Sequence, residues 1–172
     1  MTVATVPLFS WRSPAWRCHD ARFPADSWEG SRYYTGRFHR APDLFAGQAT
    51  WLALYTAAGP EVALGEAIRY LSPTMRKVAD YRLTELSVTL VSVLDLRDPA
   101  AYGIDGVTLL DDWDYSLPHN IAEAALRRGA DGVLVPSATR LGHNIIVLPD
   151  NLIPGVGVAV TSFRSLRHVL RD

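Results

Sequence analysis

The stretch 86–96 constrains the fold most, because its apolar and β-branched residues are typical of a buried β-strand. It reads LSVTLVSVLDL. Leu86, Val88 and Leu90 lie on one face of such a strand, and the apolar pattern shifts to the other face at Val91. We therefore expect a strand that is buried on both faces or carries a bulge.

Strands outnumber helices in the rest of the sequence. Short apolar runs bounded by turn residues predict further strands over 14–20, 51–56, 132–136, 144–149 and 156–160. Helices are expected over 60–71 and over 120–128, where Gly129 follows. The segment 24–50 is rich in Pro, Gly, Asp and Arg and predicts a long loop with one short strand at 33–38. Because helices and strands do not alternate regularly, we expect a mixed α+β domain with a strand-rich core and a few flanking helices.

The helix expected over 60–71 begins at a proline, which is favourable in the first helical position. Leu64, Ile68 and Leu71 form its apolar stripe, and Pro73 ends it. The stripe predicts the face by which this helix packs on the core.

Glu66 lies opposite that stripe, about 200° around the helix axis. A solvated glutamate is one interpretation. The other is chemical, because Val62, Ala63 and Tyr70 surround its row of the helix with apolar and aromatic groups. A carboxylate between apolar surfaces is a candidate for catalysis.

Charge and cysteine content exclude several protein classes. The one cysteine, Cys18, excludes an intrachain disulfide and fits a reducing cytoplasm. A formal net charge of −1 and a pI near 6.5 argue against bulk nucleic-acid binding. No stretch approaches the roughly 20 apolar residues that span a bilayer. No basic side chain precedes Arg12, so we expect a cytoplasmic protein with no signal peptide and no membrane partner.

Arginine is unevenly distributed. Lys77 is the single lysine among 17 basic residues, and a GC-rich genome accounts for such a bias in the total. It does not account for the clustering of six arginines, namely Arg12, Arg17, Arg22, Arg32, Arg37 and Arg40. Such a cluster suits recognition of phosphate or carboxylate. Aromatic residues between these arginines also allow a single-stranded nucleic-acid binder, an alternative of a different class; they are Trp11, Trp16, Trp28, Tyr33, Tyr34 and Phe38.

Familiar catalytic motifs are absent, namely a P-loop, HExxH, paired CxxC and GxSxG. The fragment Gly155-Val-Gly157 is expected to form a turn. Asp111, Asp112 and Asp114 could hold a hard cation, but they lack EF-hand spacing, so a solvated loop is the simpler interpretation.

Three polar sites have structural interpretations. The His-Asn pairs at 119–120 and 143–144 lie near element boundaries, which favours capping or turn roles. Cys18 adjoins Arg17 and His19, which could lower the pKa of its thiol. Neighbours in a strand point to opposite faces, so a packed cysteine is favoured.

Four segments, in order along the chain, resemble the RES domain family, which is named after an Arg, a Glu and a Ser. The segments are GRFHRAPD (36–43), WLALYTAAGPEVALGEAIRYL (51–71), VLDLRDP (93–99) and GADGVLVPSATRLGHNIIVLP (129–149). The resemblance implies a single RES domain over 1–172, with a core of about 14–149 and a C-terminal strand and helix extension over 150–172. It also implies a core similar to the ADP-ribosyltransferase fold.

The resemblance further implies an NAD-degrading toxin that cleaves the nicotinamide–ribose bond. NAD would be the substrate, with no metal. Its protein partner would be an Xre-type antitoxin whose C-terminal segment plugs the NAD site, and nucleic acid would be contacted only through that antitoxin. Water as acceptor would make a glycohydrolase, inorganic phosphate a phosphorylase, and a protein side chain an ADP-ribosyltransferase; the resemblance leaves these three open.

The family motifs carry over to five residues of this chain, and His39 stands where the motif has an asparagine, either as its replacement in hydrogen bonding or as a spectator. The resemblance implies Glu66 and Arg37 as catalytic residues, with Glu66 stabilising positive charge on the ribose. For NAD binding it implies Arg17, Arg37, Tyr55, Ser137 and His39. The two arginines suit the pyrophosphate, and Tyr55 offers a ring for nicotinamide or a hydroxyl for ribose. Two departures stand out: His39 and Arg40 replace the common Asn-Pro, and Cys18 replaces the tyrosine of some members.

Overall fold

The structure is a computed structural model that describes residues 3–45, 47–70 and 80–169. The strands are β1 (Leu8–Asp20), β2 (Leu54–Ala57), β3 (Tyr81–Asp95), β4 (Gly132–Pro136), β5 (His143–Val147) and β6 (Gly157–Ser165). The α-helices are α1 (Pro60–Tyr70), α2 (Gly106–Leu109), α3 (Ser116–Arg127) and α4 (Leu166–Val169). Short 3-10 turns are η1 (Val3–Thr5), η2 (Glu29–Arg32), η4 (Pro99–Tyr102) and η5 (Pro149–Asn151). The predicted mixed α+β class is confirmed.

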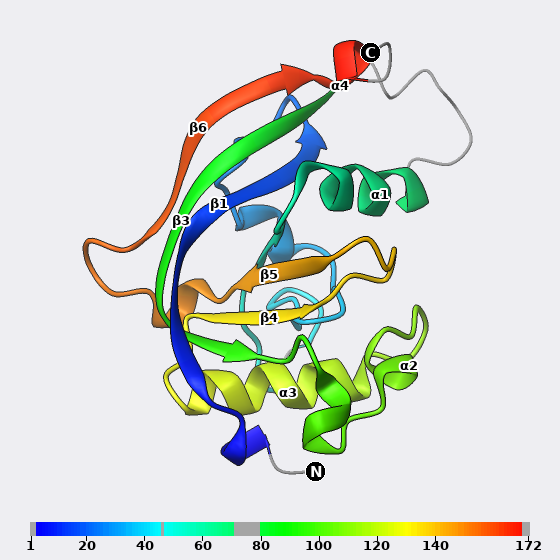
Figure 1. Cartoon of the computed structure of the whole chain (residues 1–172). Helices are drawn as coiled ribbons and strands as arrows, with labels where there is room; N and C mark the ends of the chain where they lie inside the picture. Colours follow the sequence, from blue (N-terminus) through cyan, green and yellow to red (C-terminus); the bar gives the residue numbers. More distant parts are fainter. Residues whose placement is uncertain (1–2, 46, 71–79, 170–172) are drawn as a thin grey trace.

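The six strands form one sheet that closes on itself. Their order is β1-β2-β5-β4-β3-β6, and β1 also pairs with β3. β3 and β4 are parallel, whereas the other paired strands are antiparallel. Figure 1 shows β1, β3 and β6 as long bent strands that curve past β4 and β5. Strands β1, β2, β4 and β5 of this closed sheet carry residues that line a pocket.

β3 is longer than the predicted strand and is irregular where the sequence indicated a shift. Its pairing with β1 loses register between Phe9 and Trp11, which face Val93 and Leu90. Leu90 and Val93 are both buried, so the apolar pattern changes face between them. The predicted bulge is therefore confirmed.

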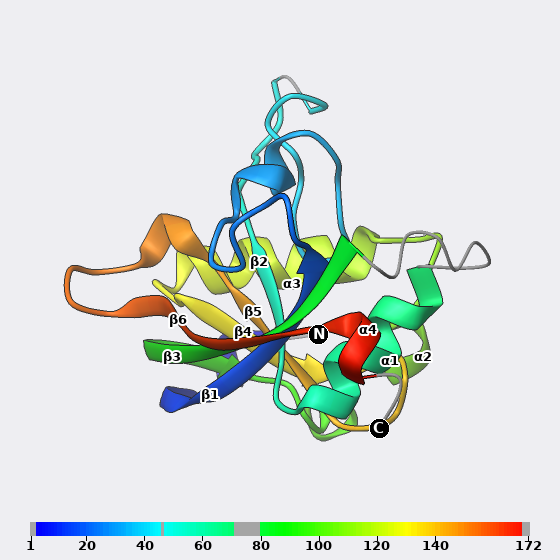
Figure 2. The same ribbon diagram turned by 90° about the horizontal axis from the view of Figure 1, so that it is seen from above.

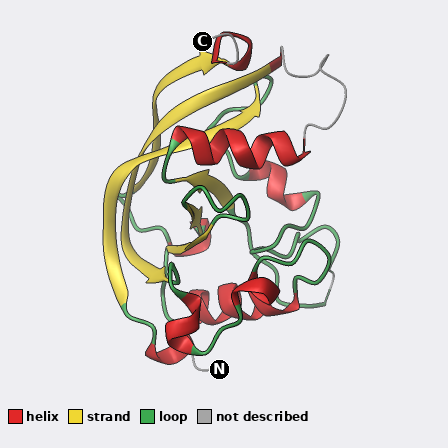
Figure 3. Ribbon diagram, turned by 45° about the vertical axis from the view of Figure 1, so that its right-hand side comes forward, coloured by secondary structure: helices red, strands yellow, loops and turns green. Residues whose placement is uncertain are grey.

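The core has two main parts on either side of the central strands. One part lies between β4, β5 and α3 and includes Leu94, Ile121 and Ile146. The other lies inside the closed sheet and includes Leu86 and Ile145. Figure 3 shows α1 and α3 on the concave side of the long bent strands and well apart from each other.

α1 packs by a different face from the one predicted. Val62 and Ala63 are buried against β2 and β3, whereas Ile68 of the expected apolar stripe is 58% exposed and Leu64 is only partly buried. The prediction was wrong because small residues allow the helix to approach the sheet closely, and Glu66 lies beside this buried face. Two other residues of the prediction lie outside the described residues, Leu71 and Pro73.

α3 begins earlier than the predicted helix, at Ser116. Pro118 falls in its first turn, where an N–H is not needed, and Gly129 follows the helix at φ +77°. His119 therefore lies inside α3, not at a cap as predicted, and its Nε2 lies 2.9 Å from the Gly36 carbonyl oxygen.

The segment between β1 and β2 forms a long irregular excursion, as predicted, which projects from one side of the sheet in Figure 2. The short strand expected at 33–38 is not formed. An isolated bridge joins Gly36 to His39 in its place, so this part of the chain is a tight turn. The turn expected at Gly155 is present, and Gly157 begins β6.

Candidate active site

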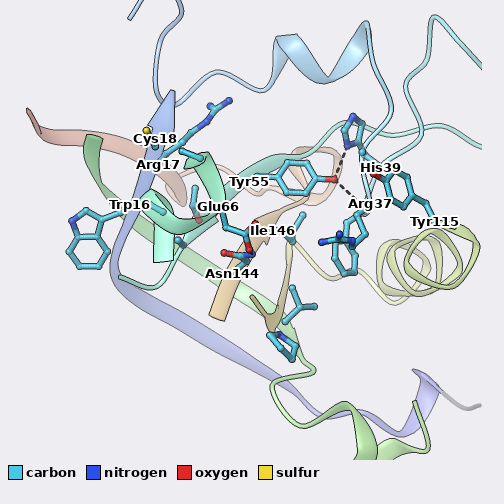
Figure 4. A pocket seen from close by; sticks show the side chains of 18 of the residues that line it. Trp16, Arg17, Cys18, Arg37, His39, Tyr55, Glu66, Tyr115, Asn144 and Ile146 are labelled. Carbon is cyan, nitrogen blue, oxygen red and sulfur yellow. Dashed lines mark hydrogen bonds between the residues drawn. The ribbon is translucent and has the colours of Figure 1, made fainter. Parts of the chain in front are cut away.

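A pocket of about 460 Å³ lies between α1, the strands β1, β2 and β5, and the turn 34–39. Its wall includes Arg17, Arg37, His39, Tyr55 and Glu66. Figure 4 shows these side chains around one cavity. Five predicted site residues from four parts of the chain are thus brought together, and the sixth, Ser137, lies directly behind Glu66.

Glu66 is held by its Oε1 atom. This atom accepts hydrogen bonds from Ser137 Oγ at 2.6 Å, the Asn144 amide at 2.9 Å and the Ala138 backbone N–H at 3.2 Å. The side chain is 19% exposed. Because three donors fix one oxygen, Oε2 is the oxygen that remains for other groups; the Arg69 guanidinium lies 3.9 Å from it. The interpretation of Glu66 as a solvated side chain is therefore wrong.

Ser137 is 0% exposed and does not line the pocket. Its hydroxyl donates to Glu66 and accepts from the Thr139 backbone N–H at 3.1 Å. The Thr139 hydroxyl lies 2.7 Å from the same oxygen. Ser137 has one hydroxyl proton and uses it in the hydrogen bond to Glu66. The Thr139 hydroxyl is therefore the donor in its hydrogen bond with Ser137. This network fixes the rotamer of Ser137 and hence the position of the carboxylate.

Asn144 was missed as a site residue. The sequence favoured a capping or turn role, but the residue lies inside β5 and its amide group reaches Glu66 across the sheet. Figure 4 shows the two side chains next to one another. The alternation of side chains along a strand gives no sign of this contact, because the partner is 78 residues away.

Tyr55 and His39 form a buried hydrogen-bonded pair. The Tyr55 oxygen lies 2.9 Å from His39 Nδ1 and accepts from the Phe38 backbone N–H at 2.8 Å. His39 Nε2 lies 2.7 Å from the Tyr34 carbonyl oxygen. A carbonyl only accepts, so Nε2 carries the proton and Tyr55 donates to Nδ1. Burial lowers the pKa of His39 and raises that of Tyr55, which keeps both groups neutral.

The turn that carries Arg37 depends on Gly36. A Cβ atom at this position would lie 2.6 Å from a His39 ring carbon and 2.7 Å from the Tyr55 oxygen. Both neighbours are held by hydrogen bonds, so only glycine fits here. The close approach of backbone, histidine and tyrosine sets the direction in which Arg37 leaves the turn.

Arg37 lines the pocket and its side chain is 10% exposed. Its NH2 donates to Asp112 Oδ1 at 2.7 Å, its Nε donates to the Asp111 carbonyl at 3.2 Å, and its guanidinium lies 6.0 Å from the Tyr115 ring centre. Asp112 Oδ2 accepts from Arg69 NH2 at 2.6 Å. The acidic group at 111–114 thus belongs to an exposed loop, as expected, in which Asp112 also joins Arg37 on the pocket wall to Arg69 on α1.

A RES domain model matches residues 14–166 of the chain. The chain belongs to the RES domain family. Two relatives are named NAD(+) phosphorylase MbcT, from Mycobacterium bovis and Mycobacterium tuberculosis; each is 31% identical over 153 residues, which cover 84% of this chain and 78% of the relative.

The RES chain is also similar in fold to a solved structure. A chain of the M. tuberculosis MbcT-MbcA toxin-antitoxin complex matches it with a TM-score of 0.78 at 23% identity, over 98% of this chain and 93% of that chain. The likeness shows that the closed sheet and its helices are arranged as in that structure.

Arg17, the early strand arginine of the RES motif, lies on the pocket wall and is largely buried. Its NH1 donates to the carbonyls of Ala25 and Ser27 at 2.8 and 2.9 Å. Burial lowers its pKa, and the Coulomb attraction of Tyr34 opposes this. No hydrogen bond from its Nε or NH2 is found to the part of the chain that the structure describes, so these two donors remain for an anion.

Cys18, where some RES members have tyrosine, packs beside α1 and also lines the pocket. Burial raises the pKa of its thiol to about 11. The neighbouring Arg17 and His19 therefore do not activate it, and the expected packed cysteine is confirmed.

The aromatic residues of the segment 11–38 do not form an exposed stacking surface. Phe38 is buried in the core, and Trp11 and Trp28 pack against buried residues of the sheet. Tyr33 and Tyr34 are exposed. Three of the six aromatic residues are thus fully or partly withdrawn from a stacking surface, which weakens the basis for a single-stranded nucleic-acid binder.

Within residues 3–45, 47–70 and 80–169, no three His, Cys, Asp or Glu side chains are grouped closely enough to hold a metal ion. Over the same residues, no helix has the length and apolar character needed to cross a membrane.

Proposed function

We propose that this RES domain cleaves the bond between nicotinamide and ribose in NAD, with inorganic phosphate as the acceptor. The observation that carries the proposal is the Glu66 carboxylate, fixed by Ser137, Ala138 and Asn144 at the wall of the pocket. Two relatives of the chain bear the name NAD(+) phosphorylase, which supports phosphate as the acceptor. The pocket volume of about 460 Å³ is that of an ordinary small-molecule site.

The chemistry requires stabilisation of positive charge. When the C1′–N bond of NAD breaks, both electrons stay on the nicotinamide nitrogen and neutralise its ring. The ribose carbon becomes oxocarbenium-like until a phosphate oxygen bonds to it, which gives nicotinamide and ADP-ribose 1″-phosphate. A carboxylate close to that ribose interacts more strongly with the transition state than with the substrate. Glu66 is suited to this role because its position is fixed before substrate binds.

The other residues would bind and orient NAD. The unpartnered donors of Arg17 and the guanidinium of Arg37 suit the pyrophosphate. Tyr55 would contact NAD by its ring, because its hydroxyl is already hydrogen-bonded to His39 and to the Phe38 backbone N–H. His39 holds Tyr55 and the turn, and Ser137 acts by positioning Glu66.

We also propose that 1–172 is a single RES domain with an ADP-ribosyltransferase-like core, as the family resemblance implies. The closed, strand-rich sheet with flanking helices supports this fold. β6 follows the proposed core of 14–149 and pairs with β3 from Arg82 to Thr89, which supports treating the extension 150–172 as part of the same domain.

We propose that the chain is a toxin held inactive by an antitoxin of the Xre type. The similar fold in the MbcT-MbcA toxin-antitoxin complex supports this partner. Co-expression with an upstream helix-turn-helix protein should relieve growth arrest in cells that produce this chain. A pair that neither binds nor restores growth would exclude that protein as the antitoxin.

The activity is tested by nicotinamide release from NAD by purified protein, with phosphate varied from zero to millimolar concentration. We expect release that depends on phosphate and a product with the mass of phosphorylated ADP-ribose. Release independent of phosphate would indicate a glycohydrolase, and transfer of ADP-ribose to protein would indicate an ADP-ribosyltransferase. No release under any of these conditions would overturn the proposal.

A further inference from the structure

Arg37 on the pocket wall and Arg69 on α1 share the carboxylate of Asp112. Asp112 Oδ1 accepts from Arg37 NH2 at 2.7 Å, and Asp112 Oδ2 accepts from Arg69 NH2 at 2.6 Å. Each oxygen thus faces a different guanidinium. A phosphoryl group presents the same arrangement of oxygens with more negative charge, so it can replace the carboxylate between the two arginines.

We propose that Arg37 and Arg69 form one phosphoryl-binding pair, and that the Asp112 carboxylate occupies the position that the phosphoryl group takes when it binds. This inference rests on the proposed function and adds two residues, Arg69 and Asp112, that the RES motifs quoted above do not assign. Asp112 then acts as an internal competitor of the ligand.

The pair lies where the reaction is proposed to occur. Arg37 is on the pocket wall, and Arg69 is one helical turn from Glu66 on α1. Arg69 NH1 lies 3.9 Å from Glu66 Oε2, the oxygen that Ser137 and Asn144 leave unoccupied. A phosphoryl group held by Arg69 would therefore be adjacent to the carboxylate that stabilises the ribose.

Asp112 can leave without unfolding its loop. Its side chain is 46% exposed, and its ion pair with Arg69, which is 32% exposed, lies near the surface, where ion pairs are weak. The loop conformation is held by other groups: Asp111 Oδ1 accepts from the N–H of Trp113 and of Asp114, and Asp114 Oδ1 accepts from the N–H of Ser116.

The arginines keep their positions when Asp112 leaves. Arg37 retains its hydrogen bond to the Asp111 carbonyl and its contact with the Tyr115 ring. Arg69 retains its neighbour Glu66. With Asp112 removed, the two guanidinium groups have a surplus of positive charge that a phosphoryl group neutralises.

The phosphoryl group could be inorganic phosphate or part of the NAD pyrophosphate. Two binding probes separate these sources: inorganic phosphate alone, and ADP-ribose, which has the pyrophosphate but no nicotinamide. Calorimetric titration of both into R69Q, R69K and D112N distinguishes them without relying on turnover. Steady-state KM values for phosphate and NAD give a second, kinetic comparison.

We expect R69Q to weaken the binding of one of the two probes about tenfold, because one charge-assisted contact is lost. R69K should recover part of that loss, and D112N should strengthen the same probe severalfold. Weakened phosphate binding assigns the pair to the acceptor, and weakened ADP-ribose binding assigns it to NAD. Matched controls are D95N and R97Q, which break an Asp–Arg pair of similar geometry at 2.7 Å outside the pocket.

The inference fails if R69Q leaves both probes unchanged, or if D112N weakens binding as R69Q does, since Asp112 would then only hold the arginines in place. D112N changes neither size nor shape, so it keeps the test decisive if R69Q does not fold. Probe binding that changes as expected in a protein unable to release nicotinamide would overturn the proposed function and leave the phosphoryl-binding pair standing.

Discussion

Ser137 Oγ lies 2.6 Å from Glu66 Oε1, although 71 positions separate the two residues in the chain. The serine follows β4 and the glutamate lies on α1, so the hydrogen bond couples the end of a strand to the helix that covers it. Because Ser137 is fully buried, it reaches substrate only through the carboxylate. Ser137 therefore has a positioning role and Glu66 a direct one, and kinetic measurements on variants of each residue can distinguish the two roles.

Removal of the Ser137 hydroxyl should lower kcat more than it changes KM for NAD. Glu66 keeps two donors in S137A, so we expect a loss of about tenfold and a stability loss of about 1 kcal/mol. Nicotinamide release and urea unfolding measure the two effects. T84A is the matched control, because Thr84 is a buried hydroxyl that bonds His19 outside the pocket. An equal loss of kcat in T84A would show that the effect is structural.

Neutralising Glu66 should abolish most of the activity without unfolding the protein. The glutamine in E66Q can accept the same three hydrogen bonds through its amide oxygen, but it carries no charge to stabilise the ribose. We expect kcat to fall by about 10²–10³-fold. E61Q, at an exposed position of the same helix, should match wild type. Full activity in E66Q would mean that another group stabilises the transition state.

The Tyr55 hydroxyl is expected to act on the fold of the site. Y55F leaves His39 Nδ1 without its donor in a buried position, so the free energy of unfolding should fall by about 1–3 kcal/mol. NAD affinity should fall with it, because the same turn carries Arg37. Y33F, with an exposed hydroxyl in the same segment, is the control. Weaker NAD binding with unchanged stability would instead indicate a direct contact between the hydroxyl and the ribose.

Much of the fold could be predicted from local patterns. β4 matches the predicted strand 132–136, and α1 begins at the predicted proline. Such features depend on residues close in sequence, namely β-branched runs, turn residues and helix starts. The buried face of α1 could not be found in this way. The pattern selects the face with the largest apolar side chains, whereas the helix packs by the smaller side chains of Val62 and Ala63.

Most candidate site residues come from the family motifs, whereas Glu66 and the clustered arginines are also indicated by their own surroundings in the sequence. Arg69 and Asp112 meet across 43 positions, and Asn144 reaches Glu66 across 78. The hydrophobic periodicity of a sequence cannot predict such pairs, because they depend on how the sheet closes. The motifs name Tyr55 and Glu66, and the structure brings the two to one pocket.

Cys18 should be unreactive toward thiol reagents in the folded protein. Burial raises its pKa to about 11, so at pH 8 its thiolate fraction is about a hundredfold below that of an ordinary cysteine. Labelling by a chromogenic disulfide should be slow in buffer and fast in urea. Because Cys18 lines the pocket, ADP-ribose should slow it further. Rapid labelling of the folded protein would contradict the packed environment.

Stability should fall as the pH drops below neutrality. Burial lowers the pKa of His39, so below its ordinary pKa of about 6.5 the unfolded chain binds more protons than the folded one. Stability therefore rises with pH through this window and is lost as pH falls from about 6.5. We expect the difference in unfolding free energy between pH 7.5 and 5.5 to be smaller in H39N, measured by urea titration at each pH. H168N, at an exposed position of α4, should keep the wild-type difference. An unchanged pH dependence in H39N would mean that His39 takes up a proton without loss of its contacts with Tyr55 and Tyr34.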